Sequence, residues 1–114
     1  MFALPIGTGR QGVNVALYAS ISDGNDPDVA LDALRMYATA QAWTVTAALY
    51  DVGPLDRAKD QRPGLVRVLR LMEDGRIEGV VTPSEAHLAV ALPLRGRAAA
   101  AFIRYVQPTE VITP

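Results

Sequence analysis

The chain has 114 residues, of which half are hydrophobic and 20% are charged, a composition that indicates one globular domain and excludes a disordered protein. Its formal net charge is −1, which argues against a domain that holds DNA by charge alone, because phosphate neutralisation supplies most of the non-specific affinity. The absence of cysteine excludes disulfides, thiolate chemistry and cysteine-based zinc sites.

Residues 1–12 are rich in glycine and lack periodicity, so we expect a flexible N-terminal extension before a single domain over residues 13–114. The segment contains Gly7-x-Gly9-x-x-Gly12, the spacing of a dinucleotide-binding fingerprint. That motif binds pyrophosphate only where it follows a strand and opens a helix. Here it precedes the first predicted strand, and we therefore expect no cofactor.

The first half of the domain predicts a strand, a helix and a second strand. Residues 13–19 form a continuous apolar run that is typical of a buried parallel strand. After a loop, Asp26 is the expected N-cap and Pro27 the first residue of a helix over residues 27–41. The apolar face expected for this helix consists of Val29, Leu31, Ala33, Leu34, Met36 and Tyr37. Residues 43–50 predict the second strand, with Trp43 packed against the helix.

The second half continues the alternation of helices and strands. A polar loop is expected over residues 51–60, a helix over 63–74 and a third strand over 77–82. The covering face predicted for this helix is Leu65, Val68, Leu69 and Met72, with Gly75 as its C-cap. A short helical turn is expected after Pro83, a helix driven by four alanines over residues 95–106, and a last strand over 109–113.

The alternating pattern predicts an α/β fold. Short connections between strands and helices imply βαβ units with right-handed crossovers. We therefore expect a three-layer sandwich in which helices flank a mostly parallel sheet. Ligands of such sheets bind at the carboxyl ends of the strands, near the point where the strand order reverses.

The ordered set of motifs resembles the N-terminal catalytic domain of serine recombinases, the resolvase/invertase family. LYASIS at residues 17–22 stands where the family has a Tyr-x-Arg-Val-Ser strand end. LRMYATAQAW at 34–43, DVG at 51–53 and RPGLVRVLRLMEDGRIEGVV at 62–81 follow in the family's order. The resemblance covers about two-thirds of the chain. It implies a resolvase-like fold with three or four strands in the order 2-1-3-4, and a role in DNA recombination.

The resemblance also implies which residues carry the chemistry. Ser22 matches the nucleophile that forms a phosphoserine linkage to DNA. Arg62 matches the arginine at the start of the second helix, and Asp51 matches the acidic position after the second strand. His87, the only histidine in the chain, is a candidate general base for Ser22, with Asp51 or Glu85 orienting it.

The chain also departs from the family pattern. Ser20 stands where the first active-site arginine is expected, Leu55-Asp56 replaces a Ser-Gly pair, and residues 84–88 lack the arginines of an Asp-Arg-Leu-x-x-Arg motif. Arginine binds phosphate bidentately and stays charged, so its loss weakens stabilisation of the transition state. We therefore predict a catalytically degenerate domain that does not exchange DNA strands alone. We also expect it to lack the family's long C-terminal helix and DNA-binding domain.

The sequence also allows other roles for Ser22 and Arg62 and other functions for the chain. Ser22 is also typical of a backbone-bonding loop residue, and Arg62 of a solvated first-turn arginine. An alternative function is a non-catalytic interaction or regulatory module acting through homodimerisation, with the apolar AAAAFI segment of the last predicted helix as its surface. A third is a small phosphate- or nucleotide-binding protein.

Partners and location follow from the same features. We expect weak DNA binding by the chain alone, a second copy or a partner recombinase as protein partner, and no metal, since no His, Asp and Glu residues have ligand spacing. No apolar run approaches the roughly 18 residues of a membrane span, and no signal-peptide pattern is present. We therefore expect a cytoplasmic protein.

Overall fold

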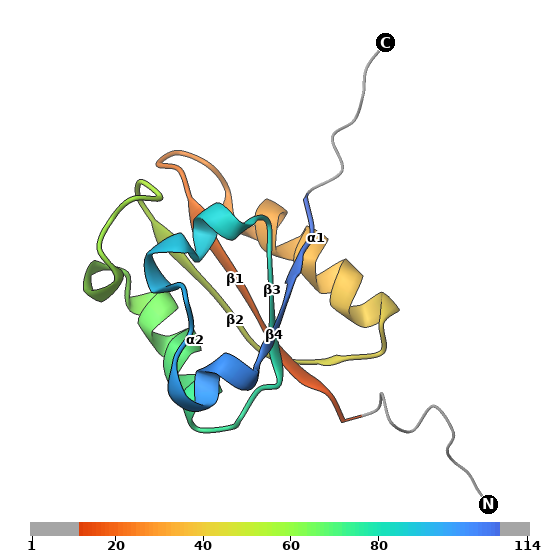
Figure 1. Ribbon diagram of the computed structural model, residues 1–114. Coiled ribbons are helices and arrows are strands. Elements are labelled where there is room, and N and C mark those ends of the chain that lie inside the picture. Colours follow the sequence, from red (N-terminus) through yellow and green to blue (C-terminus); the bar gives the residue numbers. More distant parts are fainter. Residues whose placement is uncertain (1–11, 108–114) are drawn as a thin grey trace, which may run out of the picture.

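The computed structural model describes residues 12–107 and contains one parallel four-stranded sheet in the order β2-β1-β3-β4 (Figure 1). The strands are β1 (Asn14–Ile21), β2 (Thr44–Val52), β3 (Gly79–Thr82) and β4 (Phe102–Tyr105). The α/β class, the parallel sheet and the strand order are confirmed. The predicted strand over residues 109–113 and residues 1–11 of the predicted extension lie outside the described residues.

Two α-helices cover opposite faces of the sheet. Helix α1 (Pro27–Ala40) packs on one face with Leu31, Leu34 and Ala38, and helix α2 (Pro63–Glu73) packs on the other face, chiefly with Leu65 and Val68. β1 lies between them and is buried along almost its whole length, as its apolar sequence predicts. The predicted three-layer arrangement is therefore present.

Local sequence signals set the ends of both helices. The Asp26 side chain accepts a hydrogen bond from the Asp28 N–H, and Pro27 begins α1, as expected. Gly75 follows the end of α2 with a φ of 72°, a conformation that glycine adopts without steric cost. The predicted apolar face of α1 is only partly correct, because Val29 and Met36 are 67% and 72% exposed.

The segment after β3 differs most from the prediction. Short 3-10 turns occupy η2 (Glu85–His87), η3 (Ala89–Ala91) and η4 (Gly96–Ala100), and the chain then enters β4. The predicted helix over residues 95–106 is therefore wrong, and with it the exposed helical AAAAFI surface. Alanine favours helices, but the following Phe102-Ile103-Arg104-Tyr105 pairs in parallel with the open edge of β3, which a sequence pattern does not reveal.

Aromatic packing holds β4 in place. The Phe102 ring lies 5.0 Å from the Trp43 ring between centroids, and Trp43 also packs edge-on against Tyr37 of α1 at 5.9 Å. The expected contact of Trp43 with α1 is thus confirmed. A Cβ on Gly79 would overlap the Phe102 ring, so this strand position has no room for a larger residue.

The second strand is longer than predicted. β2 continues to Val52, so Asp51 is a buried strand residue rather than the first residue of a loop. A short 3-10 turn, η1 (Lys59–Gln61), leads from this strand into α2. Over residues 12–107, none of the helices has the length and apolar character needed to cross a membrane.

Candidate functional site

A buried hydrogen-bond network connects β1, β2 and the start of α2 at the carboxyl ends of the strands. The Tyr18 hydroxyl donates to Asp51 Oδ2 at 2.7 Å and accepts from Arg62 Nη2 at 3.1 Å. Arg62 Nη1 donates to the Leu55 carbonyl at 3.2 Å, and Nη2 also donates to the His87 carbonyl at 2.6 Å. Arg62 is fully buried, and its charge is therefore directed into the protein.

Asp51 caps α2 from a neighbouring strand. Its Oδ1 accepts from the Gly64 N–H at 2.8 Å, and its Oδ2 accepts from the Leu65 N–H at 2.9 Å. These N–H groups belong to the first turn of α2, where no intrahelical acceptor exists and negative charge is favourable. A Cβ on Gly64 would come within 3.0 Å of Asp51 Oδ2, which explains the glycine of the Arg62-Pro63-Gly64-Leu65 motif.

Burial controls the ionisation of Tyr18. Loss of solvent and the hydrogen bond to Asp51 both raise the pKa of the Tyr18 phenol far above its ordinary value of 10.0, against the lowering effect of Arg62. Tyr18 therefore keeps its proton and donates a hydrogen bond to Asp51. Its neutral hydroxyl lies between the carboxylate and the guanidinium and bridges them.

A second, more open group of side chains lies beyond this network. A cavity of about 470 Å³ collects Ser20 and Ser22 from the end of β1 and His87 from η2, and the start of α1 completes its wall with Asn25, Asp26, Val29 and Ala30. Ser22 is exposed, and its carbonyl accepts from the Asn25 N–H at 3.0 Å in the turn after β1. The Ser20 hydroxyl points to the Gly53 carbonyl at 3.4 Å.

At this end of the sheet the His87 ring takes the place of β3 as a hydrogen-bond partner of β1. β3 pairs with β1 only as far as Leu17, and the His87 Nδ1 atom then accepts the Ser20 N–H at 2.9 Å. A neutral imidazole carries one proton, so the proton of His87 lies on Nε2. Burial and the nearby Arg62 charge lower the pKa of His87 below its ordinary value of 6.5, which favours this neutral form at neutral pH.

The four candidate residues therefore form two separate groups. Ser22 and His87 line the same cavity, while Asp51 and Arg62 belong to the buried network with Tyr18 and do not line it. His87 joins the groups, because its carbonyl accepts from Arg62 and its ring accepts from Ser20. Of the two carboxylates expected to orient His87, Asp51 instead accepts from Tyr18 and from the first turn of α2, and the Glu85 side chain is exposed.

Sequence reasoning did not single out Tyr18 as a functional position. A signal was present, since a tyrosine four residues before the serine matches the family's strand end. Its apolar neighbours nevertheless make Tyr18 look like an ordinary core residue. Within residues 12–107, no cluster of three or more His, Asp or Glu side chains has the geometry to hold a metal ion.

Comparisons with known proteins find relatives in structure and not in sequence. No protein-family model matches the chain, and a search of curated proteins finds no match. The N-terminal catalytic domain of TP901-1 integrase is similar, with a TM-score of 0.62 and 25% identity over 80% of this chain and 75% of that one. The C-terminal catalytic domain of ISC1926 TnpA, an IS607-like serine recombinase, matches with a TM-score of 0.67 and 22% identity over 87% and 72% of the two chains. This chain therefore has the fold of a serine recombinase catalytic domain.

Proposed function

We propose that this recombinase-like domain acts in DNA recombination without cleaving DNA itself. The observation that carries the proposal is the burial of Arg62. Every hydrogen bond found for its guanidinium goes to Tyr18, Leu55 or His87 inside the protein. Phosphoryl transfer needs positive charge around the non-bridging oxygens, and a buried guanidinium with these partners does not reach a phosphate at Ser22.

The cavity around Ser22 supports the same proposal by its charge. Among its described lining residues there is no lysine or arginine, and the carboxylate of Asp26 is present. A phosphate diester placed there would meet a negative charge instead of a clamp of cations. Loss of one stabilising donor typically costs about 10²–10³ in rate. The arginines that the family pattern predicts at residue 20 and within residues 84–88 are replaced by other residues in this chain.

The tautomer of His87 provides a third line of support. A general base needs a free nitrogen lone pair directed at the nucleophile. In His87 the Nδ1 lone pair accepts the Ser20 N–H, and Nε2 carries the proton. His87 in this form therefore has no lone pair available to activate Ser22.

A covalent trapping experiment tests the proposal. The full chain is incubated with nicked or mismatched suicide DNA substrates, and protein–DNA adducts are measured by denaturing electrophoresis and mass spectrometry, with an active serine recombinase as positive control. We expect no adduct. An adduct that Ser22→Ala abolishes and Ser20→Ala retains would refute the proposal and identify Ser22 as a working nucleophile.

An interaction module is the second candidate function. The exposed apolar side chains of Val29 and Met36 on α1 favour it, because exposed apolar side chains grouped on one surface often mark interaction sites. This surface differs from the AAAAFI segment expected from the sequence. Light scattering at several protein concentrations tests this candidate, and a strictly monomeric chain would count against it.

A further inference from the structure

We propose that copies of this chain associate head to tail, with the solvent-facing stripe of α1 in one copy seated in the groove beside α2 of the next. The inference rests on the second candidate function, an interaction module, and needs no DNA cleavage, although Val29 of the stripe also lines the cavity around Ser22. It rests on three observations: an apolar groove, an exposed apolar stripe on a helix, and opposite charges around the two surfaces.

The groove lies between α2 and the segment that follows η2. It encloses about 860 Å³, and its apolar wall includes Val66 and Leu69 from α2 with Leu92 and Leu94 from the opposite side. All four side chains are partly buried, and Leu69, Leu92 and Leu94 pack against the hydrophobic core on the α2 side of the sheet. The groove therefore offers apolar surface that the chain itself leaves open to solvent.

The stripe on α1 has the spacing of a helix that docks into such a groove. Val29, Ala33 and Met36 are four and three residues apart, and Val29 and Met36 are 67% and 72% exposed. They lie opposite the buried residues Leu31 and Leu34, so α1 has apolar side chains on both sides. Anchors at positions i, i+4 and i+7 are typical of helices that bind in apolar grooves.

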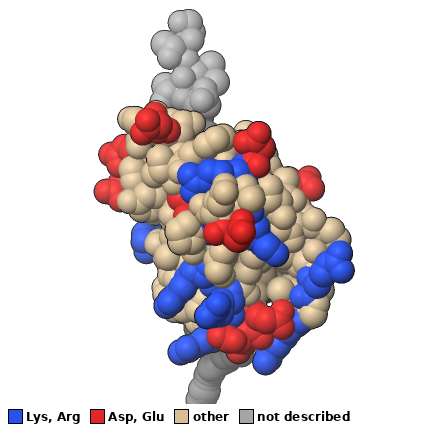
Figure 2. Space-filling view, turned by 90° about the vertical axis from the view of Figure 1, so that its left-hand side faces the viewer, with Lys and Arg blue, Asp and Glu red and all other residues tan. Residues whose placement is uncertain are grey.

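The charges around the two surfaces are complementary. Residues 23–40 carry four aspartates against one arginine. The groove is lined by Lys59, Arg70 and Arg95, and of its two acids Glu73 already accepts backbone hydrogen bonds from Arg97 and Ala98. Figure 2 shows many Lys and Arg side chains over the lower part of the face on the α2 side. This complementarity favours an acidic helix as the occupant, and α1 of a second copy is such a helix.

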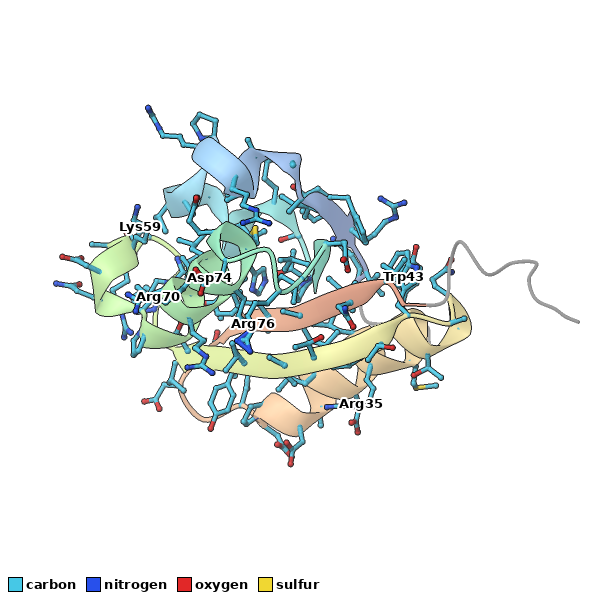
Figure 3. All side chains as sticks on the ribbon, turned by 90° about the horizontal axis from the view of Figure 1, so that it is seen from below. Arg35, Trp43, Lys59, Arg70, Asp74 and Arg76 are labelled. Carbon is cyan, nitrogen blue, oxygen red and sulfur yellow. The ribbon has the colours of Figure 1, made fainter. Side chains whose placement is uncertain are left out.

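The placement of the two surfaces determines the type of assembly. In Figure 3, Lys59 and Arg70 lie on the α2 side of the sheet, while Arg35 marks α1 on the opposite side. One chain therefore cannot fill its own groove with its own α1. A contact between two different surfaces is heterologous, and repeating it gives open chains or closed rings rather than only dimers.

Sedimentation velocity of the full chain over a wide concentration range tests the assembly. We expect species larger than a dimer at high concentration, and we expect them to dissociate as salt is added, because screening weakens the attraction between charges. The double variant Val29→Glu with Met36→Glu should be monomeric. The double variant Tyr50→Glu with Val52→Glu, which places the same two charges on exposed apolar residues of β2 outside both surfaces, is the matched control and should assemble like the parent chain.

Mixing two blocked chains distinguishes a head-to-tail contact from a symmetric one. The first is the α1 double variant, which keeps its groove, and the second is Leu69→Lys, which keeps its α1 stripe. Each alone should be monomeric, and the mixture should form a 1:1 dimer and nothing larger. If Leu69→Lys does not fold, as judged by circular dichroism, Lys59→Glu with Arg70→Glu replaces it, because both side chains are exposed.

Three outcomes would overturn the proposal. They are a parent chain that stays monomeric at every concentration, an assembly that the α1 double variant does not disrupt, and a mixture of blocked chains that remains monomeric. A symmetric dimer would appear instead as a blocked chain that still dimerises by itself, because a symmetric interface uses one surface twice and one of the two blocked chains keeps that surface intact.

Discussion

Arg62 directly precedes helix α2 at the edge of the sheet where ligands of parallel α/β folds bind, yet its guanidinium points inward. It is fully buried and donates to a phenol and to two carbonyls from separate segments of the chain. Arginine suits this task because its planar fork offers five donors in fixed directions. At the scale of the residue, an expected phosphate ligand acts as a structural connector.

Replacing Arg62 tests this structural role. Arg62→Lys keeps the charge but loses the fork, so unpaired acceptors remain in the interior, and we expect the free energy of unfolding to fall by about 2–4 kcal/mol. Urea unfolding at neutral pH measures the change. Arg67→Lys, on the exposed face of α2, is the control and should change stability by less than about 0.5 kcal/mol. Equal stability of the two variants would contradict a structural role for Arg62.

His87 should make stability depend on pH. In the folded chain its pKa is lowered below 6.5 by burial and Arg62, and the carboxylate of Asp26 also lines its cavity. As the pH falls through about 6.5, the unfolded chain takes up a proton that the folded chain does not, so the free energy of unfolding decreases. Protonation also removes the Nδ1 acceptor of the Ser20 N–H.

Urea unfolding between about pH 5 and 8 measures this dependence. His87→Asn keeps a side-chain oxygen for the Ser20 N–H and does not titrate, so we expect its midpoint to change less with pH over this window. A variant with the same pH dependence as the parent chain would exclude His87 as the cause.

Helix α2 begins where it does because β2 supplies the cap. Asp51 accepts from the Gly64 and Leu65 N–H groups and from the Tyr18 hydroxyl, so a strand residue satisfies the open end of a helix. Arg62, the residue before α2, contributes no side-chain cap of its own. The element is therefore stabilised by a residue twelve positions before its first residue, Pro63.

Asp51→Asn is expected to weaken the start of α2. An amide has one acceptor oxygen and an NH₂ group that repels the N–H donors, so we expect a loss of about 1–3 kcal/mol and faster hydrogen exchange at Gly64 and Leu65. Chemical denaturation and amide exchange followed by NMR measure both effects. Asp60→Asn in the exposed η1 turn is the control, and unchanged exchange in Asp51→Asn would show that the cap is not needed.

Prediction succeeded for elements whose signals are local. The start of α1 follows from Asp26 and Pro27, and the two ends of α2 follow from Pro63 and Gly75, because caps act over a few residues. It failed for β4, where alanines favour a helix but the edge of β3 is available for pairing. The candidate residues were predicted to gather at the carboxyl ends of the strands, but their division into a buried network and a cavity depends on side-chain directions that periodicity does not give.

For the whole molecule, the overall charge predicts weak DNA binding. The net charge is −1, and the cations near α2 are mixed with acids such as Glu73 and Asp74. Non-specific affinity comes from released counterions and needs several cations that contact phosphates together. We expect no saturable binding of a fluorescent duplex at physiological salt, measured by anisotropy. Tight binding with a steep salt dependence would contradict this prediction and indicate an organised basic surface.

Local signals were sufficient to predict the α/β class, the start of α1 and the ends of α2, because periodicity and caps act over a few residues, and the resemblance to serine recombinases predicted the strand order. Long-range packing determined that Arg62 is buried with partners inside the protein, that the His87 ring accepts from Ser20 through Nδ1, and that residues 102–105 form a strand. The physical reason is distance along the chain. Tyr18 lies 44 residues from Arg62, and Ser20 lies 67 residues from His87, so these partners meet only when the sheet has formed.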